Sequence, residues 1–250
     1  PRFPVPQTFK LPNGLTVLLV QESSLPYVSA QLVVASGSDS SPLDRPGLAN
    51  FSAQLLNQGT ATKNALQIAD AAAQLGATMG VDSSMDASTV STAALARNFA
   101  AALGLMADVA LHPSFPAEEV ERQRAARLAD LVQRRSSPPA IATTVFSAAL
   151  YGTSHPYGFT ELGTVESNKR MTRDELQIFW RSHFSPANAA LVVSGAITLP
   201  ELRRLAESEF GSWTGSAVAA TTLGQATPTS AKLVLVDRPG RGYGDDYSPW

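Results

Sequence analysis

The chain has 250 residues, of which 44% are hydrophobic and 16% charged, and it contains no cysteine. Its 19 lysines and arginines and 21 aspartates and glutamates give a formal net charge of −2. This composition excludes an intrinsically disordered chain, a disulfide scaffold, thiolate metal sites and a cysteine nucleophile. It also lacks the basic excess that is typical of nucleic-acid binding. No apolar run reaches the ~18–20 residues of a membrane-spanning helix, and the N-terminus lacks the pattern of a signal peptide. We therefore expect no nucleic-acid partner and no membrane span.

The first elements in chain order are a hairpin, a longer strand and a helix. Asn13-Gly14 predicts a hairpin over residues 8–20, because both residues tolerate positive φ. A second strand is predicted over 28–35. A helix is then expected from Pro46 to Gly59, by the preference for proline at helix starts and glycine at helix ends.

Later elements follow from hydrophobic periodicity and from capping pairs. Asn64 with Gln67 predicts a helix start, as do Thr172 with Glu175 and Thr198 with Glu201. The remaining expectations are a strand–turn–strand unit over 77–93, helices over 97–111, 116–135 and 140–150, a strand over 189–194, a linker over 211–230 and a final strand over 232–236. This order lacks regular βαβ alternation. It predicts an α+β fold with a mostly antiparallel sheet covered by helices.

The three histidines give a weak catalytic signal. His112 and His183 lie at predicted helix ends, where a capping role is favoured, and His155 lies in a turn-rich loop. No two histidines fall within one helix turn, so no local zinc pair is expected. No Gly-x-Ser-x-Gly motif occurs, although a Ser/His/Asp triad can assemble from distant positions.

An arginine-rich stretch lies in the predicted helix over 116–135. Residues 121–127 carry Arg122, Arg124 and Arg127. Glu118 precedes Arg122 by four residues, a spacing at which opposite charges pair on a helix. This pattern predicts a solvated helix face rather than an anion site.

The segment from Pro46 to Thr60 resembles the active-site helix of the insulinase/pitrilysin/processing-peptidase family, the inverted zinc peptidases. Other segments are similar to that family as well, and the resemblance covers residues 7–237. These segments are Leu11–Leu15, His155–Gly158, Leu162–Thr164, Phe184–Ala189 and Val192–Gly195. The resemblance implies a metallopeptidase-like domain of the processing-peptidase type.

The family's inverted motif is His-x-x-Glu-His, with a third ligand from a later helix. In this chain Asn50, Ala53 and Gln54 hold the three motif positions, and the third-ligand position falls at about Asp130. Neutral amide oxygens are poor zinc ligands, and alanine cannot accept a proton from water. The resemblance therefore implies the family fold without its zinc chemistry. We expect no catalytic residue, metal or cofactor here, and zinc only in a catalytic partner.

In catalytic members an edge strand binds the substrate. The corresponding stretch here includes Gly80, Val81, Asp82 and Ser83. A strand edge can offer backbone donors and acceptors to an extended peptide, although a glycine weakens a strand. These four residues are the expected substrate-binding residues.

Family members usually contain this unit twice or pair two chains around a chamber. The resemblance thus implies a degenerate domain over 1–237, and residues 238–250 as a tail or linker towards a second domain. It favours a non-catalytic homologue that pairs with a catalytic domain or subunit to form a peptide-binding chamber. The alternatives are a structural or assembly subunit without peptide binding, and a hydrolase that uses serine and histidine in the same fold. Bacterial members are often exported, so a periplasmic or secreted location is expected.

Overall fold

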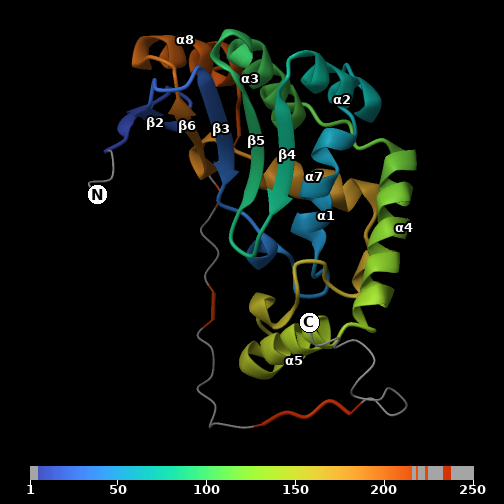
Figure 1. Ribbon diagram of the computed structural model, residues 1–250. Coiled ribbons are helices and arrows are strands. Elements are labelled where there is room, and N and C mark those ends of the chain that lie inside the picture. The colour runs from blue at the N-terminus through green and yellow to red at the C-terminus, as the bar shows by residue number, and fades with distance from the viewer. Residues whose placement is uncertain (1–4, 216–217, 219–222, 225–232, 238–250) are drawn as a thin grey trace, which may run out of the picture.

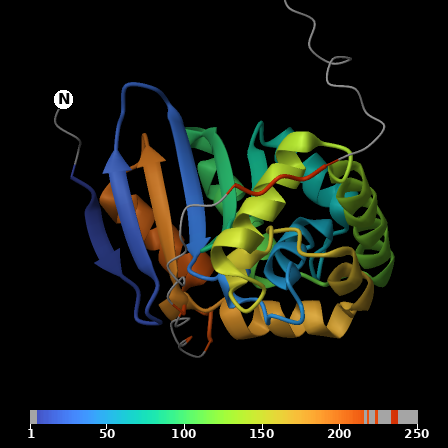
Figure 2. The same cartoon turned by 90° about the horizontal axis from the view of Figure 1, so that it is seen from below.

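The computed structural model describes residues 5–215, 218, 223–224 and 233–237 (Figure 1). These residues form one six-stranded sheet with helices packed against it, as Figures 1 and 2 show from two directions. The strands are β1 (Gln7–Lys10), β2 (Thr16–Gln21), β3 (Tyr27–Val34), β4 (Thr78–Ser83), β5 (Ser88–Leu95) and β6 (Ala189–Gly195). The α-helices are α1 (Leu48–Gln54), α2 (Ala65–Gln74), α3 (Ala96–Leu111), α4 (Ala117–Arg134), α5 (Pro138–Tyr151), α6 (Val165–Arg170), α7 (Arg173–His183) and α8 (Leu199–Phe210).

The sheet has the strand order β1-β2-β6-β3-β5-β4. Its neighbouring strands pair antiparallel except β2 and β6, which are parallel. The predicted α+β class with a mostly antiparallel sheet is therefore confirmed. In the described part of the chain β4 is an edge strand that pairs with β5 alone.

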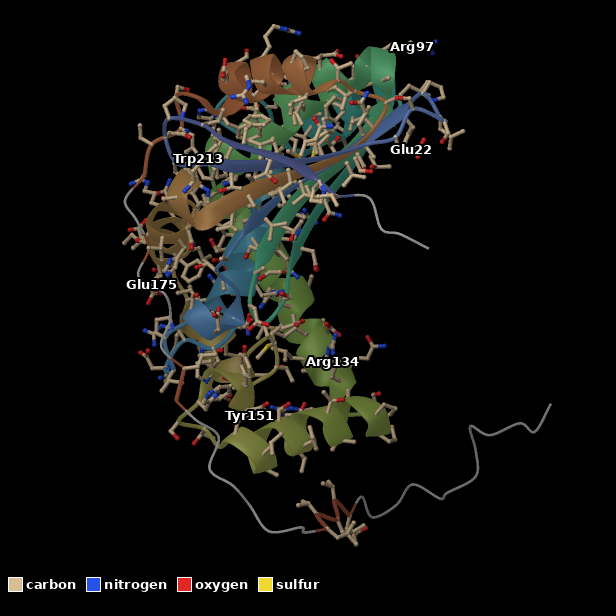
Figure 3. All side chains as sticks on the ribbon, turned by 90° about the vertical axis from the view of Figure 1, so that its left-hand side faces the viewer. Glu22, Arg97, Arg134, Tyr151, Glu175 and Trp213 are labelled. Atoms are coloured by element: carbon tan, nitrogen blue, oxygen red, sulfur yellow. The ribbon has the colours of Figure 1, made fainter. Side chains whose placement is uncertain are left out.

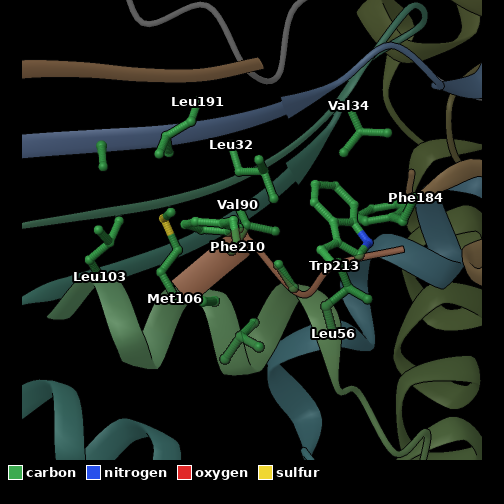
Figure 4. Packing of buried hydrophobic residues seen from close by; sticks show 14 of the residues in the cluster. Leu32, Val34, Leu56, Val90, Leu103, Met106, Phe184, Leu191, Phe210 and Trp213 are labelled. Atoms are coloured by element: carbon green, nitrogen blue, oxygen red, sulfur yellow. The ribbon is translucent and has the colours of Figure 1, made fainter. Parts of the chain in front are cut away.

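The core lies between one face of the sheet and the helices. Along β3, buried Val28, Ala30, Leu32 and Val34 alternate with more exposed residues, as expected of a strand covered on one face. Figure 4 shows side chains of α3 pointing at the sheet, with Phe210 and Trp213 beside them. This single cluster fixes α1 and α4 relative to the edge strand.

The turn and the helix caps that the sequence predicts are present in the fold. The Asn13-Gly14 turn joins β1 to β2, and Gly14 has a φ of +98°. The amide of Asn13 donates to the carbonyl oxygens of Phe210 and Trp213, at 2.7 and 3.0 Å, so the turn also contacts the end of α8. The capping box of Asn64 with Gln67 makes both of its hydrogen bonds, and so does that of Thr172 with Glu175.

The helix predicted from Pro46 starts later. It begins at Leu48, because Gly47 adopts a φ of +92° as the N-cap residue. A Cβ on Gly47 would lie 2.5 Å from the carbonyl oxygen of Leu162, so only glycine fits this approach. The α-helix ends at Gln54, and a short 3₁₀ turn continues to Gln58 before Gly59. Two further short 3₁₀ turns are Ser38–Ser40 and Pro156–Gly158, and the second lies in the predicted turn-rich loop of His155.

Two other expectations need correction. The strand predicted over 232–236 is wrong for its described part, since Leu233–Asp237 has no regular structure and Leu233 and Leu235 are exposed. A run of apolar, β-branched residues forms a strand only where a sheet edge accepts its backbone hydrogen bonds, and no strand of the described residues does so here. Helix α6 was not predicted. Most of the predicted linker over 211–230 and the tail over 238–250 fall outside the described residues.

Candidate functional site

Helix α1 carries the three motif positions. Asn50 is 7% exposed and Ala53 is 1% exposed, while Gln54 is half-buried. Residues four apart lie on one face of a helix, so Asn50 and Gln54 present their amides in the same direction. That direction is towards α4, which runs beside α1 in Figure 1.

The side chain between these two amides is Arg127 of α4. Its Nη1 donates to Oδ1 of Asn50 at 2.6 Å and to Oε1 of Gln54 at 2.7 Å. The guanidinium carbon lies 4.8 Å from the centre of the Phe51 ring, within the range of a cation–π contact. Arg127 is only 3% exposed. A buried cation therefore occupies the space between the motif positions.

The other donors of Arg127 reach α6, the loop before it and the N-cap of α1. Its Nε donates to Oδ1 of Asn168 at 2.8 Å, and its Nη2 lies 3.1 Å from the carbonyl oxygen of Leu162 and 3.5 Å from that of Gly47. A guanidinium has five N–H groups, and all five are directed at oxygens here. Each of these oxygens belongs to a neutral amide or peptide group.

Burial lowers the pKa of Arg127 to about 10, and nearby Asp130 opposes this effect. The guanidinium is therefore protonated at neutral pH. Its burial contradicts the predicted solvated face of α4. The prediction failed because the acceptors of Arg127 come from α1 and from the segment before α6, which lie far away in the sequence.

Asp130 does not join Asn50 and Gln54. Its carboxylate accepts from Nε of Arg134 at 3.1 Å, and its side chain is 43% exposed. Figure 3 shows Arg134 at the end of α4 that lies nearest α5. The side chain of α4 that contacts both amides is Arg127, and not the expected third ligand Asp130.

Arg122 and Arg124 of α4 each pair with a glutamate three residues earlier and also contact a distant group, Gln58 and the carbonyl oxygen of Asn168 respectively. Arg122 donates to Glu119 at 2.8 Å rather than to the predicted partner, Glu118. The sequence contains one indication that Arg127 is buried. Arg127 follows the buried Val120 by seven residues, so both side chains lie on the same face of α4.

These residues do not fit a zinc ion. The two amide oxygens on α1 accept hydrogen bonds from a cation, and a second cation at that point would be repelled by the first. The part of the chain that the structure describes also brings no three His, Cys, Asp or Glu side chains together as a metal cluster. The amide oxygens on α1 therefore bind the guanidinium of Arg127 rather than a metal ion.

The predicted substrate strand, β4, lies directly beside this site. Nδ2 of Asn50 donates to the carbonyl oxygen of Ser83 at 3.3 Å, at the end of β4. Val81 packs against the core and Asp82 is exposed, while Ser83 is buried, with its hydroxyl 3.3 Å from that of Ser88. Gly80 lies opposite Ser91 in the register. The four predicted positions thus form the last four residues of the edge strand next to α1.

An acidic pair lies at the same end of β4. Burial raises the pKa of Glu161, the carboxylate of Asp82 raises it further, and Arg134 opposes both effects. Asp82 and Arg134 thus act on the pKa of Glu161 in opposite directions.

The histidines have structural contacts. His155 accepts from the Tyr157 N–H at Nδ1 (3.1 Å), and its Nε2 lies 2.9 Å from the carbonyl oxygen of Gly224. His183 contacts the carbonyl oxygen of Phe179 at 2.8 Å, in the last turn of α7, as its predicted capping role requires. Both nitrogens of the buried His155 are thus used by backbone groups, which leaves the proposed Ser/His hydrolase without a free base at this residue.

The loop that holds His155 also contacts the turn between β4 and β5. The hydroxyl of Tyr157 donates to the carboxylate of Asp86, and this hydrogen bond is the main cause that raises the pKa of Tyr157 to about 12. This hydrogen bond holds the turn at the end of β4 next to the loop.

Comparisons with known proteins agree with this architecture. Residues 16–157, more than half of the chain, match the family model described as insulinase (peptidase family M16). Residues 170–242 match the model described as the peptidase M16 inactive domain. No helix among the described residues combines the length and apolar character needed to cross a membrane.

Individual relatives are similar over most of this chain. An uncharacterized zinc protease of Mycobacterium leprae is 29% identical over 81% of this chain and 45% of its own length. A crystal structure of a peptidase M16 inactive domain from Pseudomonas fluorescens has a TM-score of 0.84 at 26% identity, covering 89% of this chain and 54% of that one. The periplasmic protease PqqL of Escherichia coli has a TM-score of 0.78 at 16% identity, covering 93% of this chain and 26% of that one, and shows the fold alone.

The chain spans about half the length of the curated relatives that it matches. Five of the six strands, β2 to β6, and the helix α1 beside the edge strand lie within the matched residues. On these grounds the chain belongs to the M16 peptidase family.

Proposed function

We propose that this chain is a non-catalytic M16 domain that holds no zinc of its own and binds extended peptide beside a catalytic partner. One observation carries the proposal: Asn50 and Gln54 take the ligand positions of the family motif and both accept from Arg127. With Ala53 at the position of the base, the chain has no group there that could activate water. Zinc is expected only in the partner.

Peptide binding is assigned to the edge of β4. An edge strand presents unpaired backbone N–H and C=O groups, and an extended peptide can add to it as a further strand. Asn50 fixes the end of β4, and the core holds Val81. Asp82 and Glu161 favour a peptide with a basic residue near that end.

Modified peptides test this mode of binding. A basic, extended peptide would be compared with two versions that are N-methylated at alternate sets of amides. Since only every second amide of an added strand faces β4, one methylated version should lose binding and the other should keep it. Equal binding by both versions would exclude strand addition.

Pairing with a catalytic homologue is the second part of the proposal. It is supported by the comparison with curated relatives, since this chain covers only about half of the length of each. The chain would be mixed with an M16 zinc peptidase subunit from the same source, and association would be measured by sedimentation. The proposal expects a 1:1 complex with faster peptide cleavage than the catalytic subunit alone. No association would contradict this part of the proposal.

The alternative is a structural subunit without peptide binding. Gly80 favours it, since a glycine within a strand weakens the strand that would bind the peptide. Under this alternative a complex with the catalytic subunit would form, but neither peptide binding nor cleavage would change. The same two measurements therefore separate the two functions.

We also propose a periplasmic or secreted location. Its support is the fold neighbour from Escherichia coli that is named a periplasmic protease. Fractionation of the source cells would test it, and recovery of the protein only with cytoplasmic markers would contradict it.

A further inference from the structure

We infer that the guanidinium of Arg127 is a built-in cation that takes the place of the zinc ion in this domain. In catalytic members, side chains at the positions of Asn50 and Gln54 would hold the metal from one face of α1. In this chain both positions are bonded to Arg127, at 2.6 and 2.7 Å. This inference rests on the zinc-free part of the proposed function, but not on peptide binding or on a partner.

Oxygen atoms surround the charge of Arg127 in the way that ligands surround a metal ion. Its five N–H groups meet five neutral oxygens, which come from α1, its N-cap, the loop before α6 and α6 itself. These are the side-chain oxygens of Asn50, Gln54 and Asn168 and the carbonyl oxygens of Gly47 and Leu162. The ring of Phe51 covers one face. A single charge thus ties together three segments.

The oxygens are themselves held in place. Nδ2 of Asn168 donates to the carbonyl oxygens of Leu162 and Thr164, both at 2.7 Å, and this orients its Oδ1 towards Arg127. Nδ2 of Asn50 donates to Ser83 and so orients the Oδ1 of that amide in the same way. Second hydrogen bonds that orient the ligands are also typical of metal sites.

The buried guanidinium has a chemical consequence for zinc binding. Restoring the two histidines on α1 should not create a zinc site while Arg127 remains, because the guanidinium fills the space and repels the ion. Replacing Arg127 by an acidic residue should supply a third ligand and remove the repulsion at once. The nearby Asp130 should not compensate, since its carboxylate is paired with Arg134.

Three variants of the whole chain test this. The first carries Asn50→His and Gln54→His, and the second adds Arg127→Glu. The third, a matched control, carries the two histidine substitutions with Arg124→Glu, because Arg124 lies one turn from Arg127 and also faces Phe51. Each variant is equilibrated with zinc chloride, dialysed and analysed for metal, and its folding is checked by circular dichroism.

The expected result is about one zinc ion per chain in the Arg127→Glu variant and none at stoichiometric level in the other two. Stoichiometric zinc in the first variant would overturn the inference, and so would its absence from a folded Arg127→Glu variant.

If the Arg127→Glu variant does not fold, a double-mutant cycle in the native chain tests whether Arg127 and Asn50 are energetically coupled. The single variants Asn50→Ala and Arg127→Met are compared with their combination in chemical unfolding. Coupling of about tenfold in the unfolding constant supports the inference. Additive effects would overturn it.

Discussion

The side chain of Asn50 joins the edge strand to the buried cation: its Nδ2 donates to the carbonyl oxygen of Ser83 at 3.3 Å, and its Oδ1 accepts from Arg127 at 2.6 Å. One amide therefore meets two demands that a histidine at this position could not meet in the same way, since a neutral imidazole has one donor and one acceptor on opposite sides of its ring. The end of β4 depends on this amide.

Asn50→Leu should lower the free energy of unfolding by about 2–3 kcal/mol, because it leaves a buried guanidinium without one acceptor. Chemical denaturation measures the change. Asn98→Leu is the matched control, since it removes one neutral hydrogen bond to the carbonyl oxygen of Leu75 and should cost about 1 kcal/mol. Equal losses in the two variants would show that the charge of Arg127 does not matter.

Arg127→Met should be the more damaging change on α4. It leaves the acceptor oxygens around this side chain without their donor, and the expected loss is about 3–5 kcal/mol. Arg122→Met removes an exposed pair with Glu119 and should change the free energy of unfolding by less than about 1 kcal/mol. Thermal and urea unfolding of both variants give the comparison. A loss below that of Arg122→Met would refute the role assigned to Arg127.

Asp86→Asn should return the pKa of Tyr157 from about 12 towards 10, because the hydrogen bond to Asp86 is the main cause of the shift. Ultraviolet titration of the phenol measures it. Asp39 is a smaller cause, so Asp39→Asn should lower the pKa of Tyr157 less.

The contact between Tyr157 and Asp86 also affects stability. The phenol is held neutral in the folded chain, so the stabilisation is present below the ordinary tyrosine pKa of 10.0 and is lost as the pH rises towards about 12. Asp86→Asn should reduce this loss. An unchanged pH profile of unfolding would contradict the contact.

Gly80 can be replaced in the edge strand if space is made for a side chain. A Cβ on Gly80 would lie 2.7 Å from Oγ of Ser91, so Gly80→Ala alone should gain little. In the Ser91→Ala background, Gly80→Ala should stabilise the chain by about 0.5–1 kcal/mol, since glycine loses more conformational entropy on folding. Differential scanning calorimetry of the four proteins tests this. Destabilisation in both backgrounds would show that the backbone of β4 requires glycine.

Signals carried by neighbouring residues were sufficient to predict most elements. The turn at Asn13-Gly14 and the capping box at Asn64 depend on contacts within a few residues, and both formed as expected. Helix α6 was missed because its capping box pairs Thr164 with Ser167, a weaker signal than a pair with glutamate or glutamine.

The site itself was only half predictable. Asn50, Ala53 and Gln54 follow from the motif, and their position on one helix follows from local periodicity. The acceptors of Arg127 do not, because its hydrogen bond to Asn50 joins residues 77 positions apart. Charge on a helix ordinarily indicates solvent, and only the packing of α4 against α1 reverses that indication.

Metal analysis of the wild-type chain tests the central claim most directly. The protein would be equilibrated with zinc chloride, dialysed and compared with Gln54→Leu. The account predicts zinc far below one ion per chain in both, because Arg127 holds the place between Asn50 and Gln54. About one zinc ion per wild-type chain that is lost in Gln54→Leu would contradict it.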